Sequence, residues 1–305
     1  MKHLFLVNPA AGKHDNTCFC SGKIHEFCKE QGLDYRIRVS KQRGDIERFA
    51  REAAETGEEY RIYACGGDGT LNEVVNGVAG YDNVAITCWP VGSGNDFVRI
   101  FSDPSRFHDL ASLTQGPETR FDLIQCGDRY SINICSMGLD ARIGTQMAAY
   151  KALPGVSGMG AYLASTAVNV IKGIHEPYTI EINGQTIQGN YTMVCICSGS
   201  YYGGGFNPVP EAKPDDGMLD VLLVSKVSRL QVAKLIGAYK AGRYAEFPDL
   251  IAHYHTTEIT IHCEKETVIN LDGESLYGTD VTFRIVPRTI RFFYPEGVHY
   301  RGAEA

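Results

Sequence analysis

The stretch best suited to chemistry is a glycine-rich run, Gly66-Gly67-Asp68-Gly69-Thr70-Leu71-Asn72-Glu73. It follows the apolar residues 61–64, which predict a strand, and it precedes apolar residues spaced as on one face of a helix. Glycines allow the backbone to approach an anion closely, and the first N–H groups of a helix point at such an anion. The run therefore predicts a loop that binds the phosphates of a nucleotide.

Asp68 stands inside this loop, where a carboxylate would repel phosphate unless a divalent cation lay between them. Mg²⁺ takes oxygen ligands and is usually bound by one or two carboxylates together with substrate phosphates. We therefore expect Mg²⁺ to accompany the nucleotide, and we expect Asp68 to act in catalysis through the metal.

A second loop of similar character, Gly92-Ser93-Gly94-Asn95-Asp96, follows a predicted strand at 84–87. Taken alone, such a run is also typical of a turn in which an Asp caps the next helix. The Walker A pattern is absent, because Gly12-Lys13 is followed by His14 and lacks the upstream glycine. The sequence thus predicts a nucleotide fold of another kind.

The elements that would position these loops alternate between strand and helix up to about residue 120. Strands are predicted at 4–7, 35–39, 61–65 and 84–87, and helices at 16–31, 46–53 and 70–79. This alternation indicates βαβ units and a parallel sheet, in which ligands bind at the carboxyl ends of the strands. Four loops should meet at that edge, beginning at Asn8, Ser40, Gly66 and Trp89.

From about residue 121 the periodicity becomes that of strands. They are predicted at 121–126, 129–135, 178–182, 186–197, 218–224, 258–263, 267–271 and 281–286, and helical periodicity only near 158–173 and 229–241. Asn183-Gly184 is typical of a two-residue hairpin turn. We predict an α/β nucleotide-binding domain over 1–120 and a β-rich, sandwich-like domain over 121–287, with 288–305 returning to the first domain.

Composition narrows the class of protein. The 305 residues are 44% hydrophobic and 21% charged, which is typical of a globular protein, and the net charge of −7 argues against a nucleic acid as partner. The uncharged stretches 152–171 and 182–210 are interrupted by glycine, so neither predicts a membrane span. No secretory signal precedes the first strand, and ten cysteines in mostly apolar stretches indicate reduced thiols. We therefore expect a cytoplasmic protein.

The two glycine-rich runs together resemble the diacylglycerol kinase catalytic-domain superfamily, above all its compact soluble bacterial lipid kinases, which are relatives of sphingosine and ceramide kinases. Further motifs of this family follow in order along most of the chain: Asn8-Pro9-x-x-Gly12, Asp122, Asn133 with Gly138-Leu139-Asp140, Asp215-Asp216-Gly217-Met218-Leu219, and Leu271-Asp272-Gly273-Glu274. Ser93 and Ser40 stand where threonine is usual in the family, and both keep the hydroxyl.

The resemblance implies a Mg²⁺-dependent transfer of the γ-phosphate of ATP to a hydroxyl of a diacylglycerol-like lipid. It implies that Asp68, with Asp96 and Asp122 in support, holds the catalytic Mg²⁺. It implies a second, structural Mg²⁺ on Asp216 and the backbone carbonyls of Lys213 and Met218. The residues that would bind ATP are Asn8, Pro9, Ala10, Ala11, Gly12, Ser40, Gly66, Gly67, Asp68, Gly69, Thr70, Leu71, Asn72, Ser93, Asn95 and Asp96.

The resemblance also assigns the general base to the Asp272-Gly273-Glu274 motif. Phosphoryl transfer to an alcohol needs an acceptor for the hydroxyl proton, and a carboxylate within hydrogen-bond reach is sufficient. The sequence does not choose between Asp272 and Glu274, and Asp-Gly is also a common hairpin turn. Two other functions stay open: an NAD kinase, which also uses a Gly-Gly-Asp-Gly loop, and a nucleotide-binding regulator without catalysis.

The expected partner is a lipid substrate at a membrane surface, and a homodimer stays open. The uncharged segment 182–210 combines glycines with aromatic residues, as an adaptable lipid-binding surface would. We expect weak, reversible association with the inner membrane surface, helped by cations beside the cleft. The candidates for that rim are Lys151, Lys172, Lys213 and Arg243.

Overall fold

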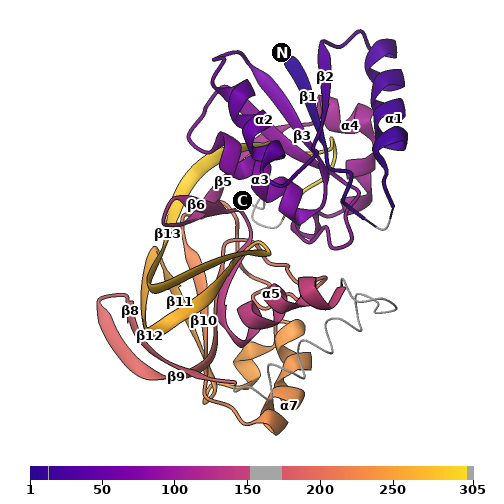
Figure 1. Ribbon diagram of the computed structural model, residues 1–305. Coiled ribbons are helices and arrows are strands. Elements are labelled where there is room, and N and C mark those ends of the chain that lie inside the picture. Colours follow the sequence, from indigo (N-terminus) through magenta and orange to yellow (C-terminus); the bar gives the residue numbers. More distant parts are fainter. Residues whose placement is uncertain (13, 152–173, 301–305) are drawn as a thin grey trace.

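The computed structural model describes residues 1–12, 14–151 and 174–300, which form two domains joined by extended strands (Figure 1). The N-terminal domain alternates strand and helix, as the sequence predicts. Its elements are β1 (Lys2–Val7), α1 (Thr17–Glu30), β2 (Tyr35–Val39), α2 (Asp45–Ala54), β3 (Tyr60–Gly66), α3 (Asp68–Val78), β4 (Val84–Pro90), η1 (Phe97–Ile100), η2 (Pro104–His108) and α4 (Leu110–Gln115).

The strands of this domain follow the order β4-β3-β1-β2, and each neighbouring pair is parallel. Two further strands, β5 (Glu118–Cys126) and β13 (Glu274–Phe293), extend the sheet beyond β4 and pair antiparallel with each other. The sheet is therefore mixed, which corrects the expectation of a parallel sheet. The physical reason is that β13 returns from the second domain without a crossover helix, so it can run against β5.

Apolar periodicity explains the helices of this domain. On α2 the residues Ile46, Phe49, Ala50 and Ala53 are buried, and charged side chains occupy the opposite face. On α3 the predicted positions Leu71, Val74, Val75 and Val78 are likewise buried. These side chains join one apolar core with the strands, which holds the first turn of α3 in place at the carboxyl end of β3.

The C-terminal domain is rich in β-strands, as predicted. After β5 it contains β6 (Arg129–Ser131), β7 (Ile134–Gly138), α5 (Leu139–Lys151), β8 (Glu176–Ile182), β9 (Gln185–Cys197), β10 (Leu219–Ser225), α7 (Arg229–Lys240), η3 (Tyr244–Glu246), β11 (Ile251–Thr256), β12 (Glu258–Leu271) and β13. Pairing runs from β7 to β9, β8, β12 and back to β7, so the sheet curls around its own apolar core.

Several predicted elements need adjustment. The strand predicted at 129–135 is divided into β6 and β7, because the N–H groups of residues 132–134 bind the carboxylate of Asp272 rather than a neighbouring strand. Helix α5 and strand β11 were not predicted from periodicity. The Asn183-Gly184 hairpin is confirmed, with φ angles of 50° and 72°. The helix predicted near 158–173 lies outside the described residues.

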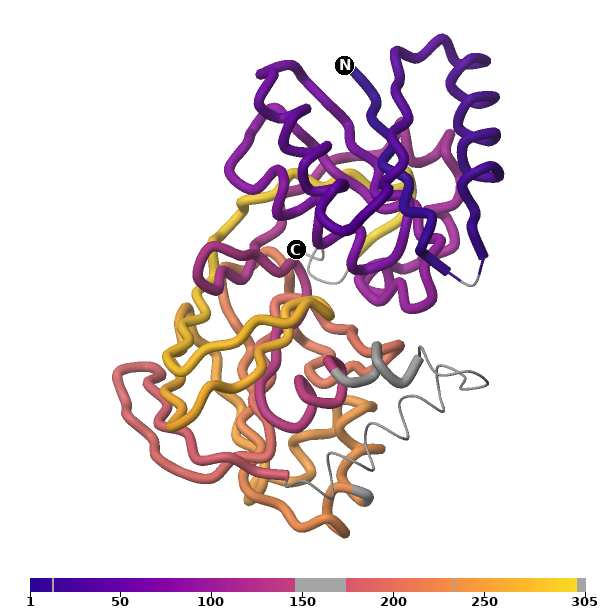
Figure 2. The backbone as a smooth tube through the Cα atoms, in the orientation of Figure 1, coloured from indigo at the N-terminus to yellow at the C-terminus, as the bar shows by residue number. Residues whose placement is uncertain are grey.

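The connection between the domains consists of β5 and β13, which pair with each other along much of their length (Figure 2). Both strands continue through the predicted boundary at residues 120–121 or 287–288, and the pairing of β13 with β5 shifts register between Val286 and Ile290. Within the described part of the chain, no helix combines the length and the apolar character needed to cross a membrane.

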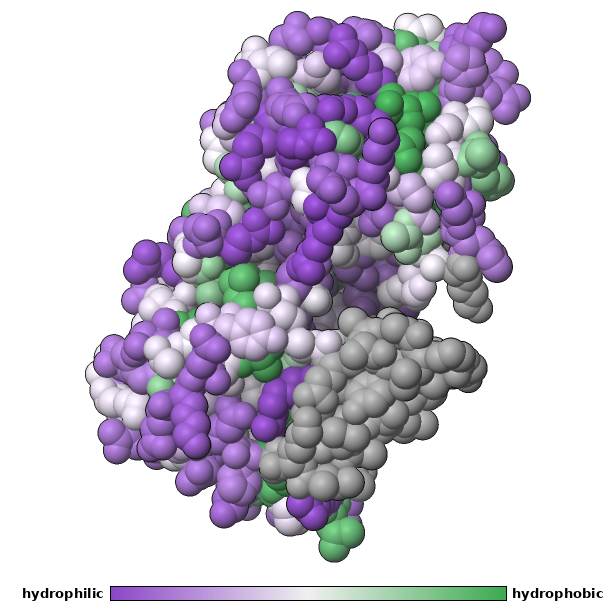
Figure 3. Space-filling view, in the orientation of Figure 1, coloured by the Kyte–Doolittle hydropathy of each residue, from purple (hydrophilic) through white to green (hydrophobic). Residues whose placement is uncertain are grey.

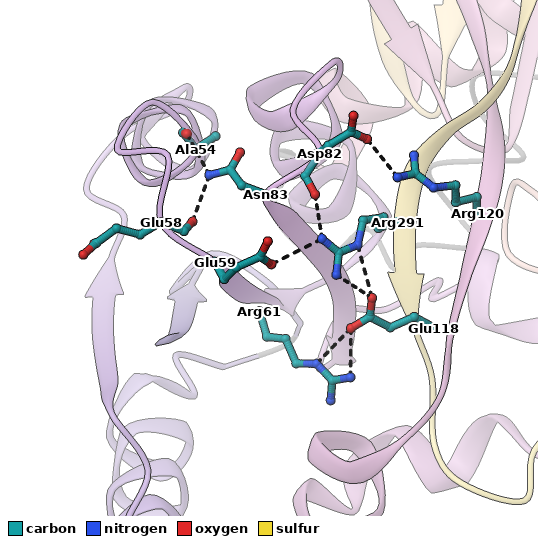
Figure 4. Close-up of polar contacts among 9 residues, drawn as sticks. All are labelled: Ala54, Glu58, Glu59, Arg61, Asp82, Asn83, Glu118, Arg120 and Arg291. Atoms are coloured by element: carbon teal, nitrogen blue, oxygen red, sulfur yellow. Dashed lines mark hydrogen bonds and ion pairs between the residues drawn. The ribbon is translucent and has the colours of Figure 1, made fainter. Parts of the chain in front are cut away.

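An ion-pair network fastens the returning strand to the first domain, at the edge of the sheet where β3 and β4 begin (Figure 4). Glu118 of β5 accepts from Arg61 of β3 at 2.9 Å and from Arg291 of β13 at 2.8 Å. Arg291 also reaches Glu59 at 3.3 Å, and the guanidinium of Arg61 lies 4.6 Å from the ring centroid of Phe293. Burial raises the pKa of Glu118, but the hydrogen bonds from Arg291 and Arg61 outweigh it and lower this pKa below its usual range.

We predict that Glu118→Gln lowers the free energy of unfolding at neutral pH by about 1–3 kcal/mol, because two partly buried guanidinium groups lose their shared carboxylate. A depressed pKa stabilises the folded state above the unfolded pKa, so the difference from wild type should vanish as pH falls below about 4. Urea denaturation across that pH range measures it. The matched control, Glu59→Gln, removes a more exposed partner of Arg291 and should cost less than about 0.5 kcal/mol.

Candidate functional site

The two glycine-rich loops are packed directly against each other at the carboxyl ends of β3 and β4. The carbonyl of Gly66 accepts hydrogen bonds from the backbone N–H groups of Val91 at 3.0 Å and Gly92 at 3.1 Å. A Cβ on Gly92 would lie 2.4 Å from the Cα of Gly67, so this approach excludes any side chain. The two loops therefore lie together, as the alternation of strands and helices predicts, and backbone atoms make the contact between them.

The first loop, which begins at Asn8, lies on the same edge. Asn8 Nδ2 donates to Thr70 Oγ1 at 3.0 Å, and Asn8 Oδ1 accepts from the backbone of Ala10 at 3.0 Å, which closes the turn over Pro9 and Ala11. Gly12 has a φ of +88°, and a Cβ there would lie 2.7 Å from the carbonyl oxygen of Val91. The fourth loop joins them, because the N–H of Ser40 donates to the carbonyl of Val7 at 3.0 Å.

Two carboxylates lie side by side beneath these loops. Asp68 is the first residue of α3, and its Oδ1 accepts from the N–H groups of Asp96 at 2.8 Å and Phe97 at 3.2 Å. Burial raises the pKa of Asp68, and these backbone hydrogen bonds oppose the rise. Burial also raises the pKa of Asp96, and the neighbouring charge of Asp68 adds to it. A cation placed here would relieve the repulsion between the two groups.

Asp96 also connects the two domains. Its Oδ2 accepts from the N–H of Gly204 at 2.6 Å, and Arg99 lies 3.1 Å from its Oδ1. Beside it, Asn95 has a φ of 49° and donates to the carbonyl of Gly92 at 3.0 Å, whereas Ser93 is exposed at the tip of the loop. The uncharged segment 182–210 thus reaches the nucleotide loops through its glycines.

Three consecutive residues among those predicted to bind the nucleotide are buried in the first turn of α3. Leu71 packs in the apolar core, so only its backbone faces the loop, and Thr70 is 3% exposed. Asn72 is 1% exposed, and its Nδ2 donates to the carbonyl of Tyr130 at 3.1 Å and to Asp272 Oδ2 at 3.2 Å. Asn72 therefore links α3 to the C-terminal domain.

Asp272 and Glu274, which the sequence could not separate, have different surroundings. The Asp272 carboxylate accepts five hydrogen bonds, and burial raises its pKa against them. The donors are Ser131 Oγ at 2.6 Å, Asn72 Nδ2 at 3.2 Å and the backbone N–H groups of Ile132 at 2.8 Å, Asn133 at 3.2 Å and Ile134 at 3.0 Å. With φ angles of 49° at Asp272 and 95° at Gly273, the motif is also the hairpin turn between β12 and β13.

Glu274, by contrast, faces the phosphate loop. Its Oε1 would be 3.9 Å from a Cβ built on Gly69, and its side chain is 30% exposed. Glu274 pairs with Arg43, whose side chain is 77% exposed and which lies in the loop after β2. Sequence reasoning missed Arg43, although it stands three residues after Ser40 in a loop already placed at the site.

The loop proposed for a second metal lies around Asp122. Asp122 is fully buried, and its two oxygens accept from the N–H groups of Arg288 and Gly217, each at 2.7 Å. Asp216 Oδ1 accepts from the N–H of Met218 at 3.0 Å, and its Oδ2 lies 3.7 Å from His255 Nε2. Asp122 thus orders the segment that follows the exposed Lys213, and its support of the Mg²⁺ on Asp68 stays a prediction. Among the residues that the structure describes, no cluster of three or more His, Cys, Asp or Glu side chains could hold a metal.

An apolar cavity of about 70 Å³ lies between α5, α7 and the sheet. Met193, Leu235 and Ile236 are among its lining residues. Tyr202 and Phe206, from the glycine-aromatic segment, line it as well, and Tyr202 Oη lies 3.0 Å from Tyr239 Oη. Asp140 gives it one polar wall and accepts from Ser136 Oγ at 2.7 Å. The same short segment therefore touches Asp96 at Gly204 and the cavity at Tyr202.

Of the four cations predicted to lie beside the cleft, the side chains of two can be described. Arg243 pairs with Glu246 at 3.0 Å, and Lys213 is exposed beside Asp216. Lys172 and the side chain of Lys151 lie outside the described residues. The surface on the face shown in Figure 3 is hollowed between the two domains.

Comparison with known proteins gives matches over nearly the whole chain. Residues 2–126 match the family described as the diacylglycerol kinase catalytic domain, and residues 133–294 match the YegS C-terminal NAD kinase beta sandwich-like domain. A protein of Chromohalobacter salexigens, described as a probable YegS-like lipid kinase, is 30% identical over 276 residues, which are 88% of this chain and 86% of the relative. A relative of the same description from Stenotrophomonas maltophilia is 28% identical over 280 residues, 88% of this chain and 89% of its own.

A solved structure also shares the fold. The crystal structure described as a diacylglycerol kinase from Bacillus anthracis superposes with a TM-score of 0.68 at 22% sequence identity, and the match covers 97% of both chains.

We predict that Asp272→Asn lowers the free energy of unfolding by about 2–4 kcal/mol, because the amide nitrogen would face N–H donors that it cannot accept from. Its matched partner Glu274→Gln should change stability by less than about 0.5 kcal/mol, since an exposed ion pair contributes little. Equilibrium urea denaturation of both variants measures the contrast. Equal losses in the two variants would contradict the different roles assigned here.

Proposed function

The chain belongs to the lipid kinases that join a diacylglycerol kinase catalytic domain to a YegS-type C-terminal domain, and on this premise we propose that it transfers the γ-phosphate of ATP to a hydroxyl group of a diacylglycerol-like lipid. The observation that carries the proposal is the position of Glu274. This carboxylate comes from the second domain, is partly exposed and lies over Gly69 of the phosphate loop.

ATP would bind where the loops of Asn8–Gly12, Ser40, Gly66–Asn72 and Ser93–Asp96 converge. Support comes from the close packing of Gly67 against Gly92, which leaves backbone rather than side chains at the surface of the loops. The amino terminus of α3 adds its unpaired N–H groups and the positive end of its dipole. Buried Thr70 and Asn72 would hold the loop in shape beneath the phosphates.

Asp68 and Asp96 would hold the catalytic Mg²⁺. The fit rests on the donor set, which is two neighbouring carboxylates whose pKa values are both raised by burial, and on Mg²⁺ preferring oxygen ligands. Bound there, Mg²⁺ would neutralise charge on the phosphates. For the structural Mg²⁺ we propose Asp216 with the carbonyls of Lys213 and Met218, a set that again offers only oxygen.

Glu274 is the general base in this proposal. The lipid hydroxyl oxygen forms a bond to the γ-phosphorus, the bond from that phosphorus to the bridging oxygen of ADP breaks, and the hydroxyl proton passes to a Glu274 oxygen. Asp272 is a positioning residue, because its five hydrogen bonds fix the turn that carries Glu274 and occupy its oxygens. Arg43 pairs with the Glu274 carboxylate and orients it across the cleft.

The apolar part of the substrate would enter the cavity between α5 and α7. By the measure in which a water molecule needs about 10–15 Å³, its volume admits about five methylene-sized groups of an acyl chain. The glycine-aromatic segment favours this route, since Tyr202 and Phe206 line the cavity while Gly204 contacts Asp96. A lipid chain held there would direct its hydroxyl towards the phosphate loop.

A panel of acceptors tests the function. We predict that radiolabelled ATP transfers phosphate to a detergent-dispersed diacylglycerol in the presence of Mg²⁺, that Asp68→Ala abolishes transfer, and that Glu274→Gln lowers kcat by about two to four orders of magnitude while nucleotide binding survives. Titration calorimetry with a nonhydrolysable ATP analogue provides the binding control. Phosphorylation of NAD with no transfer to any lipid would refute the proposal while leaving the nucleotide site intact.

A second prediction concerns the cavity. Ile236→Trp should fill it and raise KM for the lipid by roughly tenfold or more, because loss of a few buried methylene groups costs about 0.8 kcal/mol each. KM for ATP should stay within about twofold of wild type. The conservative control Ile236→Val leaves the cavity open and should behave as wild type. An unchanged lipid KM in the Trp variant would remove the cavity from the substrate path.

A further inference from the structure

The segment 221–245 carries five basic residues and no acidic one, in a chain whose net charge is −7. These residues are Lys226, Arg229, Lys234, Lys240 and Arg243. Helix α7 lies entirely within this segment, so all of its charges are positive. A cluster of one sign in a protein of the opposite net charge favours a partner that is itself anionic.

The amino-terminal half of α7 combines these cations with an exposed apolar side chain. Leu230 is 79% exposed, and Lys234 lies one helical turn further on the same stripe. Lys226 and Arg229 are also exposed, just before and at the start of the helix. A leucine left in water among cations has no role in the core, which on this helix is served by Leu235, Ala238 and Tyr239.

The position of this surface adds a second observation. A hollow at the start of α7 is lined by Lys226 and Arg229, so two cationic side chains face one depression. Arg229 shares its face of the helix with Val232 and Ile236, which line the apolar cavity, whereas Leu230 and Lys234 lie on the other face. The helix lies at the end of the C-terminal domain remote from the N-terminal domain (Figure 1).

We propose that Lys226, Arg229, Leu230 and Lys234 form an α7 docking surface for an anionic lipid bilayer. The proposal rests on the proposed lipid kinase function and names how that enzyme reaches its substrate. Leucine inserts at the boundary between headgroups and acyl chains, while lysine and arginine contact lipid phosphates. Each cation near such a surface contributes about 1 kcal/mol, which is a factor of about five in partitioning.

A bilayer explains this set of residues better than a nucleic acid or an acidic protein. A nucleic acid would use the cations but gains nothing from Leu230, and it would not explain why the same helix borders an apolar cavity. A bilayer docked here would contact the helix whose other face borders that cavity.

Vesicle sedimentation of the full chain tests the surface. Wild type should bind vesicles that contain phosphatidylglycerol more strongly than pure phosphatidylcholine vesicles. Lys226→Glu with Lys234→Glu should reduce this binding by roughly tenfold or more, and Leu230→Asn should reduce it on both vesicle types. The matched control, Lys29→Glu with Lys265→Glu, makes the same charge change at exposed sites on α1 and β12 and should lose less than about threefold.

Activity on lipid dispersed in neutral detergent separates this proposal from the function itself. The α7 variants should keep wild-type kcat there, because no bilayer is involved, and lose activity only on vesicles. Equal vesicle binding by α7 and control variants would overturn the docking surface, as would a change of oligomeric state with vesicle binding intact. Normal binding with no lipid phosphorylation in either medium would overturn the function and leave the surface standing.

Discussion

The carboxylate of Asp272 lies between the two domains and accepts hydrogen bonds from both. One donor comes from Asn72 on α3, which begins at the phosphate loop, and the others come from the segment 131–134 between β6 and β7. Burying a carboxylate costs free energy unless its lone pairs accept hydrogen bonds, so the donors around Asp272 must keep these positions. It fixes where the β12–β13 turn stands relative to α3, and Glu274 is two residues along that turn.

Three other carboxylates likewise accept hydrogen bonds from separate segments of the chain and hold those segments together. Asp96 accepts from Gly204 and so links the second glycine loop to the segment that lines the apolar cavity. Asp122 holds the 214–217 loop to β13 through two backbone N–H groups. Glu118 joins β3, β5 and β13 at the far edge of the sheet. Most of the donors to Asp96 and Asp122 are backbone N–H groups. Their positions are set by the strands and loops that carry them.

A lipid kinase must bring a highly charged nucleotide and an apolar chain to one point. The loops at the carboxyl ends of β1, β3 and β4 offer backbone and carboxylates, whereas the cavity beside α7 offers aliphatic and aromatic side chains. The segment around Tyr202–Phe206 is where these two environments meet. Its glycines let the chain approach Asp96 closely, and its aromatic residues belong to the cavity wall.

The sequence by itself determined the elements and loops whose chemistry is local. Apolar periodicity located β1 to β4 and α1 to α3, and glycine content located the loops that converge, because strand, helix and turn preferences act over a few residues. Family motifs located Asp68, Asp272 and Glu274. Periodicity did not find α5, whose sequence contains Gly144 and whose apolar positions are irregular.

Only the tertiary structure decided what depends on residues distant along the chain. Asp272 and Glu274 are two positions apart, yet one is enclosed by donors from residues 72 and 131–134 and the other faces Gly69 and Arg43. The mixed sheet, the placement of Asp122 and the ion pair of Arg43 likewise arise from contacts between segments that no local preference encodes. The sequence specifies which carboxylates are present. Hydrogen bonds from backbone N–H groups distant along the chain decide which of these carboxylates remain free to react.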